Sequence, residues 1–167
     1  GGGTQLLPRL VGVQQALGMM LTGKNTYPKK AKRIGLVDAL IHPPGLHRAA
    51  VEAAKRLANG TLAPERPPAS FAERLLESNP VSRRIIYQQA RERARKETRG
   101  NYPAPPKIID CVKTGMEQGL DAGLDVEARH FADLVFTPES RALVSLFFAK
   151  RKGDTNPHAD DARPVHE

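Results

Sequence analysis

Glycine and proline divide the 167-residue chain into short segments, because the chain contains fourteen of each. Proline interrupts a helix that it does not begin, and glycine readily ends a helix in the left-handed conformation. Between these residues, apolar side chains recur at helical spacing, and no apolar run approaches the about 20 residues needed to cross a membrane. The sequence therefore predicts a mainly α fold of several short helices, exposed connectors and at most one short strand.

The first third of the chain predicts four helices and this one strand. A break at Gly12 separates the first two helices, and Gly23 ends the second. The segment "YPKKAKRIG" begins its helix with Pro28 and has Gly35 just after its end. The apolar stretch "LVDALI" follows and predicts the strand, whereas "PPGLHRAAVEAAKRLANG" predicts an amphipathic helix.

The remainder of the chain predicts further helices on either side of proline-rich connectors. After "TLAPERPPAS", Ser70 and Glu73 form a capping box for the short helix "FAERLLES". The longest predicted helix begins at Pro80 and ends before Gly100. Three more helices follow, in "PPKIIDCVKTGMEQG", "DVEARHFADLVF" and "TPESRALVSLFFAKRK", the last with Thr137 as its cap. Beyond them the chain is polar and turn-rich, which predicts a flexible tail.

A formal net charge of +8 favours partners that carry negative charge, such as nucleic acid, an acidic membrane surface or a phosphorylated cofactor. The basic residues gather on the helix that begins at Pro80, where glutamates interrupt them and aromatic side chains that would stack on bases are missing. Nucleic acid is therefore disfavoured, peripheral association with a membrane stays open, and the plain alternative is a charged helix face in water.

Residues that could carry chemistry are few. The single cysteine, Cys111, excludes an intrachain disulfide and sits among apolar residues that favour a place in the core. Glu127 and His130 are spaced to touch on one helix, as surface pairs commonly do. The five histidines have no metal-ligand spacing, and we predict no metal site: His42, His47, His130, His158 and His166.

The glycine run at Gly1, Gly2 and Gly3 matches neither a phosphate-binding loop nor a dinucleotide fingerprint. Its physical chemistry still allows a helix start whose bare N–H groups face an oxygen-bearing ligand. The carboxylates of the chain, such as Glu52, Glu73 and Glu127, lie far along the sequence from this run, so we expect no pair of them beside it.

The order of the motifs carries a resemblance. "GGGTQLLPRLVGVQQALGMMLTGK" followed by "AKRIGLVDALI" resembles the second half of the crotonase fold of enoyl-CoA hydratases, although Leu6 stands where that family often has arginine. "RGNYPAPPKIIDCVKTGMEQGLDAGLDVEARHFADLVFTPESRALVSLFF" is similar to the segment between the hydratase and dehydrogenase parts of the multifunctional fatty-acid β-oxidation α subunit. The resemblance implies a crotonase end at 1–60, a helical connector at 61–150 and a flexible linker at 151–167. It also implies that the apolar faces of the helices around 106–118 and 138–149 pack partly against other domains of the parent enzyme, so we expect both faces to be exposed in this chain.

In that family two glutamates act as acid and base on one water, and two backbone N–H groups hold the thioester oxygen. Both glutamates precede the glycine turn, and the NAD fingerprint of the dehydrogenase follows the linker, so the resemblance predicts a fragment that lacks both active centres. Gly1, Gly2 and Gly3 would then be a substrate-adjacent turn, with no catalytic residue and no cofactor bound by this chain.

For the parent enzyme the resemblance implies acyl-CoA substrates, NAD, the rest of the α subunit and a thiolase β subunit as partners. It also implies the bacterial cytoplasm or the mitochondrial matrix as the compartment. The alternative, from a different class, is a non-catalytic basic helical module that binds an acidic membrane or nucleic acid.

Overall fold

The structure is a computed structural model that describes residues 1–63 and 79–154. The predicted helix "FAERLLES" with its Ser70–Glu73 capping box lies outside the described residues, as does the tail after residue 154. By its contacts the chain divides into two units, residues 1–127 and 128–167, which are described separately below. The described part is helical without a strand, which confirms the predicted mainly α fold.

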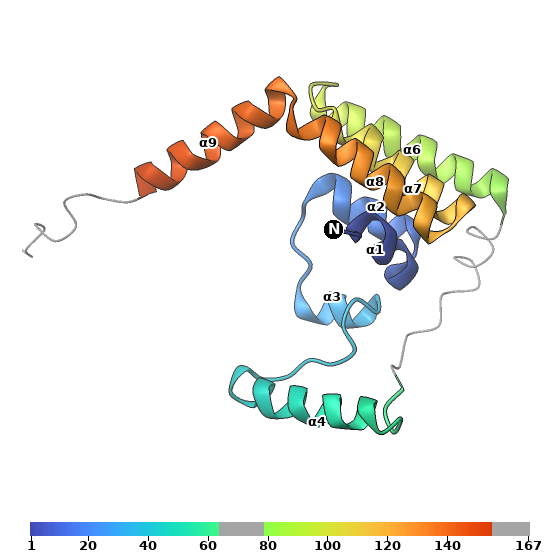
Figure 1. Cartoon of the computed structure of the whole chain (residues 1–167), viewed down its shortest axis with the longest axis vertical. Helices are drawn as coiled ribbons and strands as arrows, with labels where there is room; N and C mark the ends of the chain where they lie inside the picture. The colour runs from blue at the N-terminus through green and yellow to red at the C-terminus, as the bar shows by residue number, and fades with distance from the viewer. Residues whose placement is uncertain (64–78, 155–167) are drawn as a thin grey trace, which may run out of the picture. The chain divides into compact units, whose positions relative to one another are not determined.

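Four helices form the core of the first unit: α1 (Gly3–Val11), α2 (Val13–Thr22), α6 (Pro80–Thr98) and α7 (Ala104–Gln118). Helix α2 contacts the other three, α7 also packs against α1 and α6, and Figure 1 shows the blue and yellow-green helices side by side. Their shared interior consists of five side chains that are almost inaccessible to solvent: Val13, Leu17, Tyr87, Ile109 and Val112. Helices from the beginning of the chain and helices that follow residue 79 therefore share one hydrophobic core.

Glycines and caps place the ends of these helices where the sequence predicts them. Gly12 lies between α1 and α2 with φ 84°, and Gly23 follows α2 with φ 60°, a left-handed conformation that costs glycine little. Helix α6 begins at Pro80, and the Asn79 side chain accepts a hydrogen bond from the Val81 amide at 2.9 Å. The predicted break at Gly12 and the predicted start at Pro80 are confirmed.

The predicted strand at residues 36–41 is wrong. Helix α3 (Pro28–Arg33) is followed closely by Gly35 with φ 75°, and the Leu36 amide donates back to the Ala31 carbonyl at 2.9 Å, so Leu36 takes part in the end of this helix. A lone strand also needs a partner strand for its backbone groups. Among the described residues there is no strand to pair with it, and 36–41 forms bends and irregular structure instead.

The predicted amphipathic helix is α4 (Leu46–Ala58), which follows a short 3-10 turn, η1 (Pro43–Gly45). Its apolar residues line one side as predicted, but none of the helix is buried, and Leu46 and Leu57 are 58% and 53% exposed. Among the described elements, η1 is the one against which α4 packs closely. Its apolar face is therefore left open to solvent.

We also expected α7 to leave its apolar face exposed for a neighbouring domain, and this expectation is wrong. Ile109 and Val112 are fully buried, because α1, α2 and α6 cover that face. Gly119 alone separates α7 from α8 (Leu120–Val135), whose residues up to Glu127 belong to the first unit. The helix thus begins earlier than the predicted segment "DVEARHFADLVF".

The second unit contains the end of α8 and α9 (Pro138–Asp154). The Thr137 hydroxyl accepts a hydrogen bond from the Ser140 amide at 3.2 Å, which confirms the predicted cap. The apolar side chains of α9 are exposed as expected, with Leu146 at 65% and Phe147 at 61%. None of the helices in the described ranges is both long and apolar enough to span a bilayer.

Candidate functional site at the start of helix α1

The glycine run forms the beginning of helix α1. Gly2 is the N-cap residue with φ 81° and is buried, and Gly3 is the first helical residue. A helix start leaves several backbone N–H groups without partners inside the helix, and the local dipole favours a negative group there. The sequence allows the glycine run to be the start of a helix, and the structure places a helix start there.

The negative group at this helix start is the carboxylate of Glu127, from helix α8. It accepts hydrogen bonds from the Gly1 amine at 3.0 Å, the Gly2 amide at 2.5 Å and the Thr4 amide at 3.2 Å. The Thr4 hydroxyl donates to the same carboxylate. Glu127 thus reaches the glycine run although it lies far from it in the sequence, because the fold places this part of α8 close to the start of α1.

These hydrogen bonds change the acidity of Glu127. Burial raises the pKa of the carboxyl group, since its side chain is only 14% exposed. The hydrogen bonds from the Thr4 hydroxyl, the Gly2 amide and the Gly1 amine outweigh burial and lower the pKa to about 2. At neutral pH the group is ionised and its oxygens are occupied as acceptors, so it is poorly suited to act as a general base.

Behind Thr4, a buried amide extends the polar network into the protein. Gln5 is 0% exposed, and its Nε2 donates to the Cys111 carbonyl at 2.9 Å and to the Thr4 hydroxyl at 3.1 Å. Arg9 donates to the Gln5 carbonyl and to the Gly115 carbonyl, each at 2.7 Å. These bonds join α1 to α7 in the interior, where unsatisfied polar groups would be costly.

Two glycines make room for Gln5. A Cβ atom on Gly115 would lie 1.6 Å from the Gln5 Oε1, and one on Gly123 would lie 2.1 Å from it. The same Cβ on Gly123 would lie 2.7 Å from the Gly115 Cα, so α7 and α8 approach closely at this point. The segments "GGGTQ", "KTG" and "DAG", far apart in the sequence, therefore meet around one glutamine side chain.

Cys111 is buried, as the sequence predicts. Burial raises the pKa of its thiol, and the nearby negative charges of Glu127 and Asp110 raise it further, which keeps the sulfur protonated and a poor nucleophile. In the described ranges no group of three or more histidine, cysteine or acidic residues is placed to hold a metal ion. His158 and His166 lie outside those ranges.

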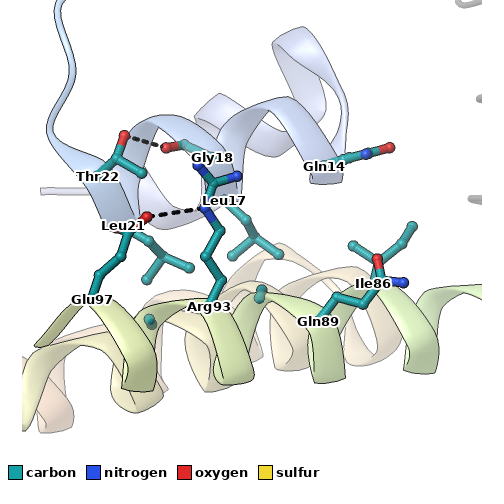
Figure 2. Close-up of a pocket in the computed structure, with 11 residues that line it drawn as sticks. Gln14, Leu17, Gly18, Leu21, Thr22, Ile86, Gln89, Arg93 and Glu97 are labelled. Atoms are coloured by element: carbon teal, nitrogen blue, oxygen red, sulfur yellow. Dashed lines mark hydrogen bonds and ion pairs between the residues drawn. The ribbon is translucent and has the colours of Figure 1, made fainter. Parts of the chain in front are cut away.

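A shallow groove of about 190 Å³ runs between α2 and α6. Figure 2 shows Leu17 from α2 and Ile86 from α6 among the residues that line it, with Arg93 and Glu97 of α6 joined by an ion pair of 3.1 Å. Both charged side chains are largely exposed, and such pairs contribute little to stability. Glutamates thus pair with part of the basic face of α6, as expected for a charged helix face in water.

The geometry defines a helical scaffold in which a glycine-rich helix start is held by a carboxylate that is distant in the sequence. Residues 1–66 match the family model described as Enoyl-CoA hydratase/isomerase. The fatty acid oxidation complex subunit alpha of Shewanella loihica is 49% identical over 98% of this chain, and that of Shewanella halifaxensis is 50% identical over 98%.

The chain spans 23% of the length of each of these relatives. Almost all of this chain is therefore similar to one segment of the fatty acid oxidation complex α subunit, and the resemblance read from the motifs is confirmed. Both relatives are subunits of a fatty acid oxidation complex, and both organisms are bacteria.

Proposed function

We propose that the chain is the part of a multifunctional β-oxidation α subunit that ends its hydratase domain and leads toward its dehydrogenase domain. In this proposal residues 1–60 complete the crotonase fold, residues 61–150 form the connector and residues 151–167 are the linker. The observation that carries it is the identity of 49–50% over 98% of the chain. The first 66 residues supply the hydratase end of the match.

The shared core supports a structural role for the connector. Helix α2, from the crotonase end, buries Val13 and Leu17 against α6 and α7 from the connector, and α1 contacts α7. Neither part would keep this core alone, because an apolar face that loses its cover exposes its side chains to water. The connector thus acts as the support of the glycine turn, and Gly1, Gly2 and Gly3 line the acyl-CoA site through their backbone.

The parent enzyme in this proposal hydrates an enoyl-CoA, oxidises the product with NAD, and works with a thiolase subunit in the bacterial cytoplasm. The chain itself supplies neither a proton-transfer pair nor an NAD site. Among the described residues, Glu127 is the carboxylate that bonds to the glycine turn, and it is held as an ionised hydrogen-bond acceptor. Hydration requires a positioned acid and base, each contributing about 10²–10⁴-fold.

The test is an activity assay of the purified 167-residue chain and of the α subunit that contains it. We expect no hydration of crotonyl-CoA and no NAD reduction with a 3-hydroxyacyl-CoA by the chain alone, and both activities in the α subunit. A host strain without its own hydratase removes the contaminating activity. Turnover by the isolated chain would contradict the proposal, as would an α subunit inactive in both assays.

The basic-module alternative has a separate test in the same preparations. Binding of the chain to anionic vesicles or to nucleic acid should fall steeply with added salt if phosphates were the partner. We expect little binding at physiological salt, because Glu97 pairs with Arg93 and Glu92 adds a second negative charge among the basic residues of the same helix. Tight binding that salt removes would favour the alternative.

A further inference from the structure

We propose that Glu127 is a positioning residue for the hydratase site, because its carboxylate holds the glycine-rich start of α1 in place from the connector. This inference rests on the proposed function, which places Gly1, Gly2 and Gly3 beside the acyl-CoA. Glu127 touches neither substrate nor water in this proposal and acts through the backbone that it fixes.

The geometry of the contact shows why one side chain can do this. Oε1 accepts a hydrogen bond from the amide of Gly2, the N-cap residue, and Oε2 accepts one from the amide of Thr4 in the first turn. The two oxygens therefore hold both the cap residue and the first turn of the helix. Hydrogen bonds to an ionised acceptor are about twice as strong as those between neutral groups. The glycine backbone would otherwise be free to take many conformations, since glycine loses more conformational freedom on ordering than other residues.

The rest of the network prevents α1 from moving away from this carboxylate. Gln5 is enclosed between Gly115 and Gly123, and Arg9 holds the Gly115 carbonyl from the far end of the helix. Gly123 and Glu127 lie one turn apart on α8, so the same helix both encloses Gln5 and supplies the carboxylate. A displacement of about 1 Å at a reacting centre can cost about 10²-fold in rate, so this support matters for activity.

The arrangement also decides what the helix start cannot do. Its N–H groups at Gly2 and Thr4 are used by Glu127, so they are not available to an anionic ligand. The ligand role allowed by the sequence for bare N–H groups is therefore replaced by a contact within the chain. The glycines serve the site by their shape and close approach, and the charge at the helix start is already compensated.

The experiment compares Glu127→Gln and Glu127→Ala with Glu117→Gln in the α subunit that contains this chain. Glu117 is an exposed residue of α7 and serves as the matched control for loss of one negative charge. We expect both Glu127 variants to lower the hydratase kcat at least tenfold with a smaller change in KM for crotonyl-CoA. The NAD-dependent dehydrogenase activity of the same preparation should be unchanged.

Thr4 provides a second pair of variants in case the Glu127 variants fold poorly. Thr4→Ser keeps the hydroxyl that donates to Glu127 and should retain the hydratase kcat, whereas Thr4→Val removes it and should lower kcat in the same direction as Glu127→Gln. Hydrogen exchange in the isolated chain should become faster at the amides of Gly2 and Thr4 in Glu127→Gln, while the core amides of α7 stay protected.

The outcomes separate this inference from the proposed function. A wild-type α subunit without hydratase activity would overturn the proposed function, while faster exchange at Gly2 and Thr4 in Glu127→Gln would still support the holding contact. An active wild type whose hydratase kcat is unaffected by Glu127→Ala and by Thr4→Val would overturn the positioning role alone. Equal losses of hydratase and dehydrogenase activity would also overturn it, since they indicate general unfolding.

Discussion

Thr4 and Glu127 form the most informative contact in this chain. The Thr4 hydroxyl donates to the Glu127 carboxylate and accepts from the Gln5 amide, so it links the surface of the site to its buried part. Each hydrogen bond supplies a partner for a polar group that would be costly to bury without one. At the scale of single residues, the glycine run is therefore held by side chains that lie beyond its own helix.

The acidity of Glu127 predicts how stability depends on pH. Its pKa is lowered in the folded state to about 2 from its ordinary value of 4.5, so its contribution is fully present above about pH 4.5. This contribution to the free energy of unfolding is lost as the pH falls toward 2, because the Glu127 carboxylate then becomes protonated in the folded state as well. Glu127→Gln should lower the free energy of unfolding by about 1–3 kcal/mol at pH 7 and by much less near pH 2.

Urea unfolding of the isolated chain at pH 7, 4 and 2.5, followed by far-ultraviolet circular dichroism, measures this difference. Glu117→Gln controls for the removal of a carboxylate that has no such partners and should change stability little at any pH. A loss in Glu127→Gln that is the same at pH 7 and pH 2.5 would contradict the assignment of the effect to the charged carboxylate.

At the scale of elements, the contact between α7 and α8 depends on two glycines within helices. A helical glycine normally costs about 1 kcal/mol relative to alanine, so replacing one usually stabilises a helix. Gly115 and Gly123 reverse that expectation, because their missing Cβ atoms leave the space that the buried Gln5 fills. These glycines therefore allow α1, α7 and α8 to pack closely together, which is a different role from ending a helix.

Gly123→Ala should destabilise the chain by about 1–3 kcal/mol, since its Cβ would meet both Gln5 and the backbone of Gly115. Gly18→Ala is the matched control, because Gly18 lies within α2 and its added Cβ would have nothing within 4 Å. This control should be neutral or stabilising by up to about 1 kcal/mol. Chemical denaturation of both variants checks the prediction, and an equal gain in both would contradict the packing argument.

At the scale of the whole molecule, each of the two units carries an apolar helix face in contact with solvent. Helix α4 in the first unit has no buried residue, and α9 in the second unit exposes several large apolar side chains. Exposed apolar patches of this kind usually mark surfaces that another part of a protein covers. They fit a chain that is similar to one segment of a longer relative.

We therefore predict that the isolated chain associates or binds a hydrophobic dye through α9. Leu146→Ser combined with Phe147→Ser should reduce both effects, because these two side chains are 65% and 61% exposed. Lys150→Ser, on the same helix, should leave them unchanged. Light scattering and dye fluorescence provide the measurement, and a monodisperse wild-type chain without dye binding would contradict this prediction.

Local sequence signals determined the helices of this protein. Gly12, Gly35, Pro80 and Thr137 act within a few residues of themselves, through backbone conformation or a cap, and each lies where its helix begins or ends. The motif order likewise predicted the similarity to the α subunit segment, since it depends on the sequence alone. The prediction of a strand at 36–41 was wrong because a strand requires a distant partner strand, which a local pattern does not reveal.

Tertiary structure alone decided what meets the glycine run. Glu127 lies more than a hundred residues along the chain from Gly2, and only the tertiary fold brings its carboxylate to the start of α1. Tertiary packing against α7 likewise buries Ile109, whereas Leu146 on α9 is exposed, although both belong to apolar helix faces in the sequence. Helix periodicity shows which side of a helix is apolar, but the cover of that side depends on which other helices the chain folds against it.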